Sequence, residues 1–281
     1  MNKKLEQIRM QQKNSWNEFS AGWKKWNDFT MDFLKPTGDE MIRVLQLNEH
    51  DHVLDIAGGT GEPALSIAAI VKHGDVTIFD LAEEMLAVAR ENANKRGIKN
   101  IQTVAGDVCE LPFPDNHFDA ISSRFGFMFF PDMQIAANEM ARVLKPGGRI
   151  AVAVWNIPAK NFWITAVMNA IKNNVALPPR PDDAPGMFRC AKDGLMKGLF
   201  SNAGFKNIKQ VEVDEKLRCE SAEQYWLMQI ELGAPIAAIL NKASDEVRKK
   251  IKADTIKAIN NKFPDGHIEI DSSALVIYGE K

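Results

Sequence analysis

The chain has 281 residues, of which 35 are Lys or Arg and 37 are Asp or Glu, and its formal net charge is −2. A balanced charge without runs of one sign argues against a general nucleic-acid binder, and no apolar run is long enough to cross a bilayer. The chain starts without the apolar stretch of a secretory signal, and its three scattered cysteines fit no zinc spacing. We therefore expect a cytoplasmic protein without a metal site, built on one large α/β domain with additions.

Residues 1–35 carry aromatic side chains at steps of three and four, which predicts one face of a helix or of a broken pair of helices. Packing of this face on the core is one interpretation. The other is that part of it closes over a substrate, because ligand sites favour aromatic linings. On the second interpretation, Trp16, Phe19 and Trp23 contact the substrate. A further helix is predicted over residues 39–47.

A glycine-rich turn follows the first predicted strand. Val53 and Leu54 lead in as a buried strand, and residues 64–71 lead out as a helix. Such a turn is where an open α/β sheet holds a nucleotide-like ligand, because glycines leave no Cβ between the backbone and the ligand. The candidate cofactor-binding residues of this segment are Asp55, Ala57, Gly58, Gly59, Thr60 and Gly61.

The charge of this turn indicates what kind of ligand it holds. Residues 59–64 fit the dinucleotide pattern G-x-G-x-x-A, which works by aiming N–H groups at a pyrophosphate. Here Glu62 adds a negative charge, Pro63 has no N–H to give, and the preceding strand ends in Asp55. The turn therefore favours a ligand that is positively charged and lacks phosphate. S-adenosylmethionine (SAM), which carries an ammonium and a sulfonium group, is such a ligand.

Two further predicted strands end in acidic residues at the same edge of the sheet. Residues 76–79 lead to Asp80, about 20 residues past the glycine turn, and residues 101–105 lead to Asp107. An acid in the first position accepts hydrogen bonds from ribose in both nicotinamide and SAM sites, and Asp107 can accept from an adenine amino group. Each acid alone could instead cap a helix, but their joint spacing favours a site. The added cofactor candidates are Asp80, Leu81, Met85, Gly106, Asp107 and Val108.

With these motifs in order, residues 53–148 resemble a class I SAM-dependent methyltransferase. They are most similar to the large bacterial group around the ubiquinone/menaquinone-biosynthesis methyltransferases. One departure is Ala57, at a position where that family often has glycine. The matching segments are residues 53–61, 79–86, 106–108 with 111–113, 118–121 and 144–148.

The resemblance implies further contacts after the fourth strand, where family members bind the methionine part of SAM and then touch the substrate. Arg124 would meet a carboxylate there. Hydrophobic packing is the alternative for the aromatic cluster over residues 127–130. The candidate cofactor contacts are Ser123, Arg124 and Phe125, and the candidate substrate contacts are Phe127, Met128 and, at the end of the fifth strand, Trp155.

The predicted fold class is α/β: a doubly wound, mostly parallel seven-stranded sheet of the Rossmann-like methyltransferase type with helical cap insertions. The resemblance implies that the last strand, predicted over 273–279, is antiparallel and lies beside the fifth. A proline-rich loop is expected over 177–186. The predicted divisions are 1–45 as an N-terminal helical segment over the pocket, 46–156 as the SAM-binding core, 157–191 as a cap insertion, 192–215 as a core helix and strand, 216–269 as a helical cap insertion and 270–281 as the last core strand.

Together these features predict a SAM-dependent methyltransferase that passes a methyl group, by in-line displacement, to a small apolar or aromatic acceptor. A nicotinamide-dependent oxidoreductase on a similar sheet and a non-catalytic SAM-binding module remain alternatives. None of the five histidines is expected where a general base would act, so the sequence assigns no catalytic residue. It predicts a small-molecule partner, no nucleic acid and no stable membrane insertion, and it leaves the acceptor atom and the oligomeric state open.

Overall fold

The computed structural model describes residues 3–179, 181 and 184–281. The first two residues of the N-terminal segment and part of the predicted proline-rich loop lie outside the described residues. The rest forms a seven-stranded sheet of order β3-β2-β1-β4-β5-β7-β6, which confirms the predicted fold class. Strand β7 is antiparallel to β5 and β6, and the neighbours among β1 to β5 are parallel. The strands are β1 (His52–Ile56), β2 (Asp75–Asp80), β3 (Ile101–Ala105), β4 (Phe118–Arg124), β5 (Leu144–Trp155), β6 (Lys206–Cys219) and β7 (Ile268–Glu280).

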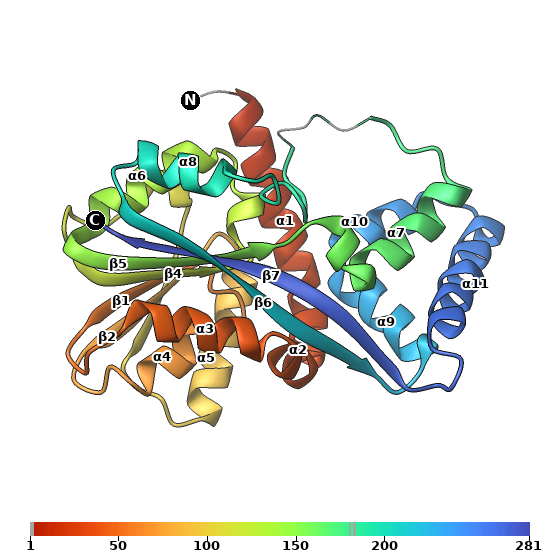
Figure 1. The fold of residues 1–281 in the computed structure, drawn as a ribbon, viewed down its shortest axis with the longest axis horizontal. Helices are drawn as coiled ribbons and strands as arrows, with labels where there is room; N and C mark the ends of the chain where they lie inside the picture. Colours follow the sequence, from red (N-terminus) through yellow and green to blue (C-terminus); the bar gives the residue numbers. More distant parts are fainter. Residues whose placement is uncertain (1–2, 180, 182–183) are drawn as a thin grey trace.

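Helices cover both faces of the sheet (Figure 1). On one face, α3, α4 and α5 pack on apolar side chains such as Val53 and Ile78, and on the other face α6 and α8 pack on Leu54 and Ile121. The sheet is therefore the middle of three layers. The helices of these two layers are α3 (Lys35–Leu45), α4 (Ala64–Ala68), α5 (Glu83–Lys95), α6 (Met133–Val143) and α8 (Leu195–Asn202).

Strands β6 and β7 extend beyond the end of the neighbouring strand β5. Strand β5 pairs with β7 only from Ala274 onward, whereas β6 and β7 stay paired out to Cys219 and Ile268. The predicted last strand over 273–279 is therefore too short. Its extra residues alternate buried Ile268 and Ile270 with acids that form ion pairs with Lys216, so the additional pairs are stabilised on both faces.

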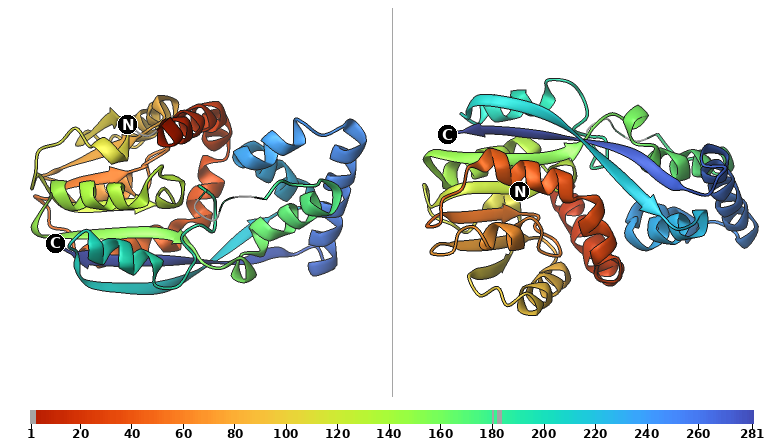
Figure 2. Two further views of the ribbon diagram at one scale, coloured as in Figure 1. Left: turned by 90° about the horizontal axis from the view of Figure 1, so that it is seen from above. Right: turned by 60° about the horizontal axis from the view of Figure 1, so that its bottom comes forward.

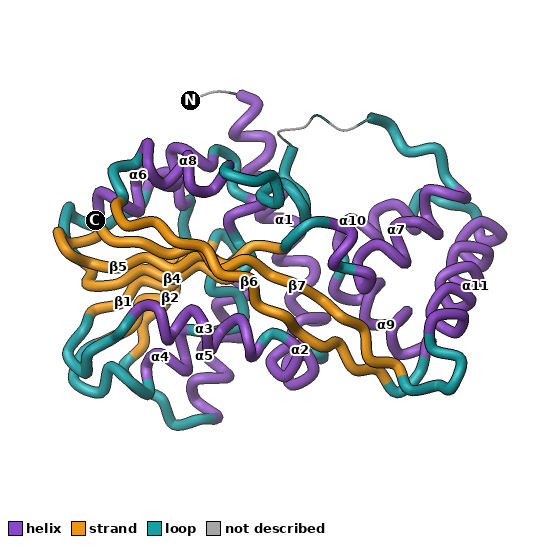
Figure 3. Tube along the Cα trace, in the orientation of Figure 1, coloured by secondary structure: helices purple, strands orange, loops and turns teal. Residues whose placement is uncertain are grey.

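This two-stranded extension carries a helical cap beyond the carboxyl edge of the sheet (Figure 3). The cap has its own small core, to which α7 contributes Val167 and Ile171, α9 contributes Trp226 and α11 contributes Ile251. Ser244 accepts a hydrogen bond from the Val247 N–H at 3.3 Å and begins α11, as its sequence position suggested. The cap helices are α7 (Phe162–Asn174), α9 (Ala222–Leu232), α10 (Ala234–Leu240) and α11 (Asp245–Lys262).

The N-terminal helices lie between the sheet and the cap (Figure 2). The chain forms α1 (Lys3–Lys25) and α2 (Asn27–Phe33), so the predicted broken pair of helices is confirmed, with the break at Trp26. Helix α1 contacts α5 of the core and α9 and α10 of the cap. No helix among the described residues is both long and apolar enough to cross a membrane.

Candidate functional site

The glycine-rich turn brings backbone close to the carboxyl ends of β1 and β2. The Gly58 N–H donates to the Phe79 carbonyl at 3.2 Å, and a Cβ at Gly58 would collide with the Ile78 side chain and lie 2.9 Å from Asp55 Oδ2. Gly59 and Gly61 have φ of +53° and +114°, which glycine adopts at little cost. Ala57, the departure from the family pattern, also has a positive φ of +56°. Strained backbone of this kind is characteristic of functional sites.

Asp55 lies under this turn and is fully buried. Its Oδ1 accepts a hydrogen bond of 2.5 Å from the Ser122 hydroxyl, because β1 and β4 pair with these two residues in register. In the part of the chain that the structure describes, its Oδ2 has no hydrogen-bond partner. Burial raises the pKa of Asp55 to about 7, partly opposed by the Ser122 hydrogen bond and the Arg124 charge. The free oxygen is ready to accept from a ligand donor.

Asp80 ends β2 and faces the same turn. Its two oxygens accept one backbone bond each, from Gly59 N and Ala82 N, both at 2.9 Å. A carboxylate has about four lone-pair sites, so acceptor capacity remains on both oxygens. Burial raises the pKa of Asp80, opposed by the backbone bonds from Ala82, Gly59 and Leu81. Asp80 therefore orders the turn and can still accept from vicinal hydroxyls.

The predicted adenine segment lies beside Asp80. A Cβ at Gly106 would collide with the Phe79 ring, so only glycine lets this backbone approach the end of β2. Asp107 accepts from the Cys109 N–H at 2.9 Å and caps the short 3₁₀ helix η1 (Val108–Glu110), so the capping interpretation is correct for one of its oxygens. The neighbouring candidates Val108 and Met85 are buried, Leu81 is half-buried, and Thr60 is buried within the turn.

The end of β4 places a cation next to these carboxylates. Arg124 Nη1 donates to the Leu34 carbonyl at 3.2 Å, and within the described part of the chain the guanidinium forms no ion pair. Burial lowers its pKa, whereas the charges of Glu62, Asp55 and Glu215 raise it. The next residue, Phe125, has a φ of +58°, and the following glycine is so close to Ala57 that a Cβ there would collide with it. Ser123 is fully buried, and its hydroxyl has no partner.

Aromatic side chains from four elements converge beyond this edge. Phe125 stacks on Trp155 of β5 with ring centroids 4.0 Å apart and an interplanar angle of 11°. Trp155 also packs against Trp163 of α7 at 4.9 Å and Phe33 of α2 at 6.1 Å. Phe33 and Trp163 meet edge to face at 5.3 Å. Core, N-terminal segment and cap therefore meet in one aromatic cluster. The sequence predicts Phe125 as a cofactor contact and Trp155 as a substrate contact, whereas Phe33, on the aromatic face of residues 1–35, and Trp163 were not among the site candidates.

The other predicted substrate residues fall into two groups. Trp16 of α1 packs edge to face on Phe129 at 5.3 Å, and Trp23 lies next to Trp16, so both lie over the carboxyl edge of the sheet. Phe127 and Met128 are instead fully buried. Phe127 packs on Phe200 of α8, in the helical layer that α8 forms with α6. That placement matches the packing alternative. Phe19 is half-buried on α1.

Two acidic residues differ from what their sequence positions suggest. Glu62 forms an ion pair with Arg96 at the end of α5 and accepts a hydrogen bond from the Ser66 N–H. The negative charge of Glu62 is therefore partly compensated within the protein. Glu215 of β6 is 1% exposed, although it stands in a strand rich in charged residues. It accepts from Thr37 Oγ1 at 2.5 Å, its Oε2 has no partner, and burial raises its pKa to about 7.

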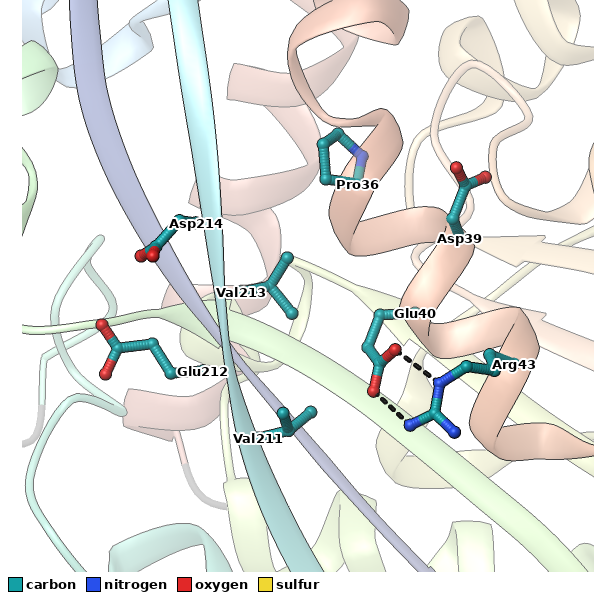
Figure 4. Close-up of a pocket in the computed structure, with 8 residues that line it drawn as sticks. All are labelled: Pro36, Asp39, Glu40, Arg43, Val211, Glu212, Val213 and Asp214. Carbon is teal, nitrogen blue, oxygen red and sulfur yellow. Dashed lines mark hydrogen bonds and ion pairs between the residues drawn. The ribbon is translucent and has the colours of Figure 1, made fainter.

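A surface groove of about 410 Å³ lies elsewhere, between α3 and β6 (Figure 4). Val211 and Val213 point toward α3, whereas Glu212 and Asp214 point away from it. The side of α3 carries the Glu40–Arg43 ion pair. None of the predicted cofactor or substrate residues lines this groove. Among the described residues, no cluster of three or more His, Cys, Asp or Glu is arranged to hold a metal ion.

Comparison with known protein families shows to which family this chain belongs. The model of the ubiE/COQ5 methyltransferase family matches residues 12–169, more than half of the chain. The chain belongs to the ubiE/COQ5 methyltransferase family. It is a SAM-dependent methyltransferase, and SAM is the methyl donor. This assignment decides against the nicotinamide-dependent alternative.

Individual relatives of this ubiE/COQ5 family member are also named as methyltransferases. The chain is 32% identical over 188 residues to a demethylmenaquinone methyltransferase of Listeria monocytogenes, which covers 61% of this chain and 77% of the relative. It is 42% identical over 120 residues to the ubiquinone/menaquinone biosynthesis C-methyltransferase UbiE of Azotobacter vinelandii, with 42% of this chain and 47% of that one covered.

Solved structures share the fold. The YcgJ protein of Bacillus subtilis matches with a TM-score of 0.56 at 23% identity and covers 87% of this chain and 97% of its own. A SAM-dependent methyltransferase of Aquifex aeolicus matches with a TM-score of 0.50 at 23% identity, covering 65% and 86%. At these identities the likeness concerns the fold alone.

Proposed function

We propose that this methyltransferase acts on a small apolar or aromatic acceptor, bound between the carboxyl edge of the sheet, α1 and the cap. The observation that carries the proposal is the aromatic cluster. Phe125 and Trp155 of the core stack on each other and meet Trp163 of the cap. Aromatic side chains from separate elements that meet at a polar ligand site are the lining expected for a flat, apolar molecule.

The predicted cofactor residues fit SAM in chemical type. Asp80 keeps acceptor capacity for the ribose hydroxyls. Among the described residues, Asp55 holds a buried oxygen without a donor, and Arg124 is a cation without an ion-pair partner. These three groups match the hydroxyls, the ammonium and the carboxylate of the cofactor. The positive-φ backbone at Ala57 and Phe125 supports a close approach in the same place.

Bound SAM supplies an electrophilic methyl group on sulfur, so the chain itself has to align the acceptor and exclude water. The aromatic cluster and α1 supply apolar surface for both tasks. Histidines do not contribute, because His50, His52, His73 and His117 lie at or before the starts of β1, β2 and β4, at the opposite edge of the sheet, and His267 lies in an exposed turn. An acceptor that is already nucleophilic when desolvated needs no such base.

The names of the relatives narrow the acceptor class. Proteins named demethylmenaquinone methyltransferase and ubiquinone/menaquinone biosynthesis C-methyltransferase are 32% and 42% identical to this chain over the matched regions. A reduced quinone ring is electron-rich, flat and apolar, which suits stacking on Phe125 and Trp155. We therefore place dihydroxyaromatic rings first among the acceptors to be tried.

The test is methyl transfer from radiolabelled SAM to two matched sets of acceptors. One set contains reduced naphthoquinones and catechols, and the other contains small polar amines such as ethanolamine and glycine. We expect label in the aromatic products only. Transfer to the amines alone would contradict the proposal. Tight binding of S-adenosylhomocysteine (SAH) without transfer to either set would favour the non-catalytic alternative.

A further inference from the structure

One face of α1 lies along the carboxyl edge of the sheet. Arg9, Trp16 and Trp23 are spaced by seven residues, which is two turns, so they share one line on the helix. The Glu6 carboxylate raises the pKa of Arg9, and the charges of Asp107 and Glu110 add to it, so this end of the line is near the predicted adenine segment. We call this line the inner stripe of α1.

Farther along the inner stripe, Trp16 lies over the core and Trp23 lies next to the cap. Trp16 packs on Phe129, which follows β4, with ring centroids 5.3 Å apart, and Trp23 lies 6.2 Å from Trp16. The helix axis advances by roughly 10 Å over these seven residues, whereas the two rings are only 6.2 Å apart, so the Trp23 ring lies beyond Trp16 on the side away from Arg9. There α1 contacts both parts of the molecule: Lys24 forms an ion pair with Glu91 of α5, and Gly22 touches α9 of the cap, so Trp23 lies where core and cap meet.

Trp23 has a buried hydrogen-bond donor that the protein does not use. Its Nε1 is buried and has no hydrogen-bond partner among the described residues. Two other indoles nearby are satisfied: Trp26 Nε1 donates to Glu231 at 2.6 Å, and Trp163 Nε1 donates to Asn161 at 3.2 Å. A buried N–H without an acceptor costs roughly 1–3 kcal/mol, so such a group calls for an explanation.

Helix α1 cannot easily turn this donor toward water. Gly22, the residue before Trp23, touches α9 so closely that a Cβ there would collide with the Glu231 carbonyl oxygen. Lys25 forms an ion pair with the Glu231 side chain at 2.7 Å, and on the core side the Asn17 side chain accepts from the Glu84 N–H at 3.1 Å. The helix is fixed at both the cap and the core, and with it the direction of Trp23.

We propose that the Trp23 indole N–H donates a hydrogen bond to an oxygen atom of the methyl acceptor. The inference rests on the proposed function and adds to it a chemical requirement: the acceptor is an aromatic or apolar molecule with a hydroxyl, phenolate or carbonyl oxygen on the side that faces α1. Stacking in the aromatic cluster would select the ring, and Trp23 would select the oxygen and fix which edge of the ring points to the methyl donor.

The experiment replaces the single N–H by an isosteric sulfur. Trp23→β-(3-benzothienyl)alanine keeps the shape of the indole and removes the donor, and the same replacement at Trp26 is the matched control. The probes are 1-naphthol and naphthalene, which differ by one oxygen. Their affinities are measured by calorimetry on protein saturated with SAH, so no turnover is needed. SAH affinity is measured separately.

We expect wild-type protein to bind 1-naphthol about five- to tenfold more tightly than naphthalene, and the Trp23 replacement to reduce this ratio to about one. Naphthalene and SAH affinities should stay unchanged. In the protein without ligand, the Trp23 replacement should raise the melting temperature, because it removes an unsatisfied donor, whereas the Trp26 replacement should lower it. A purely structural Trp23 would not combine higher stability with a lost preference for oxygen.

Three results would overturn the proposal, and they are distinguishable from one another. If both probes bind and the Trp23 replacement leaves their ratio unchanged, the hydrogen bond is wrong but the aromatic acceptor site stands. If neither probe binds, the proposed function itself fails. A loss of SAH affinity in the Trp23 variant would assign the N–H to the cofactor and also refute the proposal.

Discussion

The contacts of Asp80 predict how its replacement will change the affinity for the cofactor product SAH. Asp80 Oδ2 orders the glycine turn by accepting from Gly59 N, Asp80 Oδ1 accepts from Ala82 N, both at 2.9 Å, and both oxygens retain lone pairs. Replacing Asp80 by Asn turns one acceptor into a donor and removes the charge. We expect SAH to bind about 10- to 100-fold more weakly to Asp80→Asn, as for the loss of hydrogen bonds to a charged group. Isothermal titration calorimetry measures this directly.

The matched control is Asp75→Asn, at the other end of the same strand, where Asp75 accepts from exposed His52 at 2.6 Å. SAH affinity should be unchanged in this variant. Equal losses in the two variants would indicate a general disturbance of β2 rather than a ribose contact.

Glu215 gives a prediction about stability and pH. Its pKa is raised from 4.5 to about 7, chiefly by burial, so between these values the folded protein binds a proton that the unfolded chain does not. The contribution of Glu215 to the unfolding free energy is then largest at low pH. It falls by about 3 kcal/mol in total as the pH rises from about 4.5 to about 7. Arg124 is the charged group that acts on Glu215, and its charge opposes the effect of burial on the Glu215 pKa.

Glu215→Gln cannot titrate, so its stability relative to wild type should increase between pH 5 and pH 8 by about 2–3 kcal/mol. Urea unfolding of both proteins across this range is the measurement. The control is Asp214→Asn, on the exposed side of the same strand, which should follow the wild-type curve. Parallel curves for wild type and Glu215→Gln would mean that Glu215 ionises normally in the folded state.

These residues also show what the sequence could and could not predict. Asp55 and Asp80 were predictable because each follows its own strand, and parallel strands share one carboxyl edge. Glu215 was missed because its neighbours are charged. Strict alternation places it on the face of Val211, Val213 and Leu217, which is the available signal. Its burial, however, depends on Thr37 of α3, a contact between residues 178 positions apart.

At the scale of elements, α1 and α9 cross in close contact at Gly22. Gly22 is the reason the two helices can touch, because any side chain there meets the Glu231 carbonyl oxygen. Gly22→Ala should therefore move α1 away from the cap. We expect a loss of roughly 1–3 kcal/mol in unfolding free energy, typical of overpacking, and faster tryptic cleavage at the lysines of α1.

Gly198 in α8 provides the matched control for Gly22. It is also a glycine within a helix, but a Cβ there meets nothing within 4 Å. Gly198→Ala should stabilise the protein by roughly 0.5–1 kcal/mol, because alanine has the higher helix propensity. A stabilising effect of Gly22→Ala would show that α1 does not rest on α9 in solution.

The elements themselves were predicted to different degrees. Strands β1 to β5 and their helices follow from short apolar runs and from the alternation of strand and helix along the chain, and the break before α11 follows from Ser244. The length of β7 did not follow, because its first residues, Glu269 and Asp271, look like loop residues. Only pairing with Lys216 and Arg218 of β6 makes them part of a strand. Long-range pairing of this kind leaves little local signal.

At the scale of the whole molecule, core and cap are connected in two ways. The β6–β7 extension passes without interruption from the sheet to the cap helices, and α1 rests on α5 at one point and on α9 at another (Figures 1 and 2). The predicted cofactor residues lie on the core, and the aromatic cluster joins core, α2 and α7. Binding at the turn is therefore in a position to affect the cap through α1.

This connection predicts which helices will exchange their amide hydrogens more slowly when SAH binds. SAH at Asp80 should hold the start of α5 more firmly, and there the Glu84 N–H donates to Asn17 of α1. Stabilised α1 should in turn hold α9 through Gly22 and Glu231. We expect hydrogen exchange to slow in α1 and α9 on adding SAH, with no more than a small change in α11, whose main contacts are α7 and α9. Protection confined to the glycine turn and β2, with α1 unchanged, would mean that the N-terminal helix does not take part in closing the site.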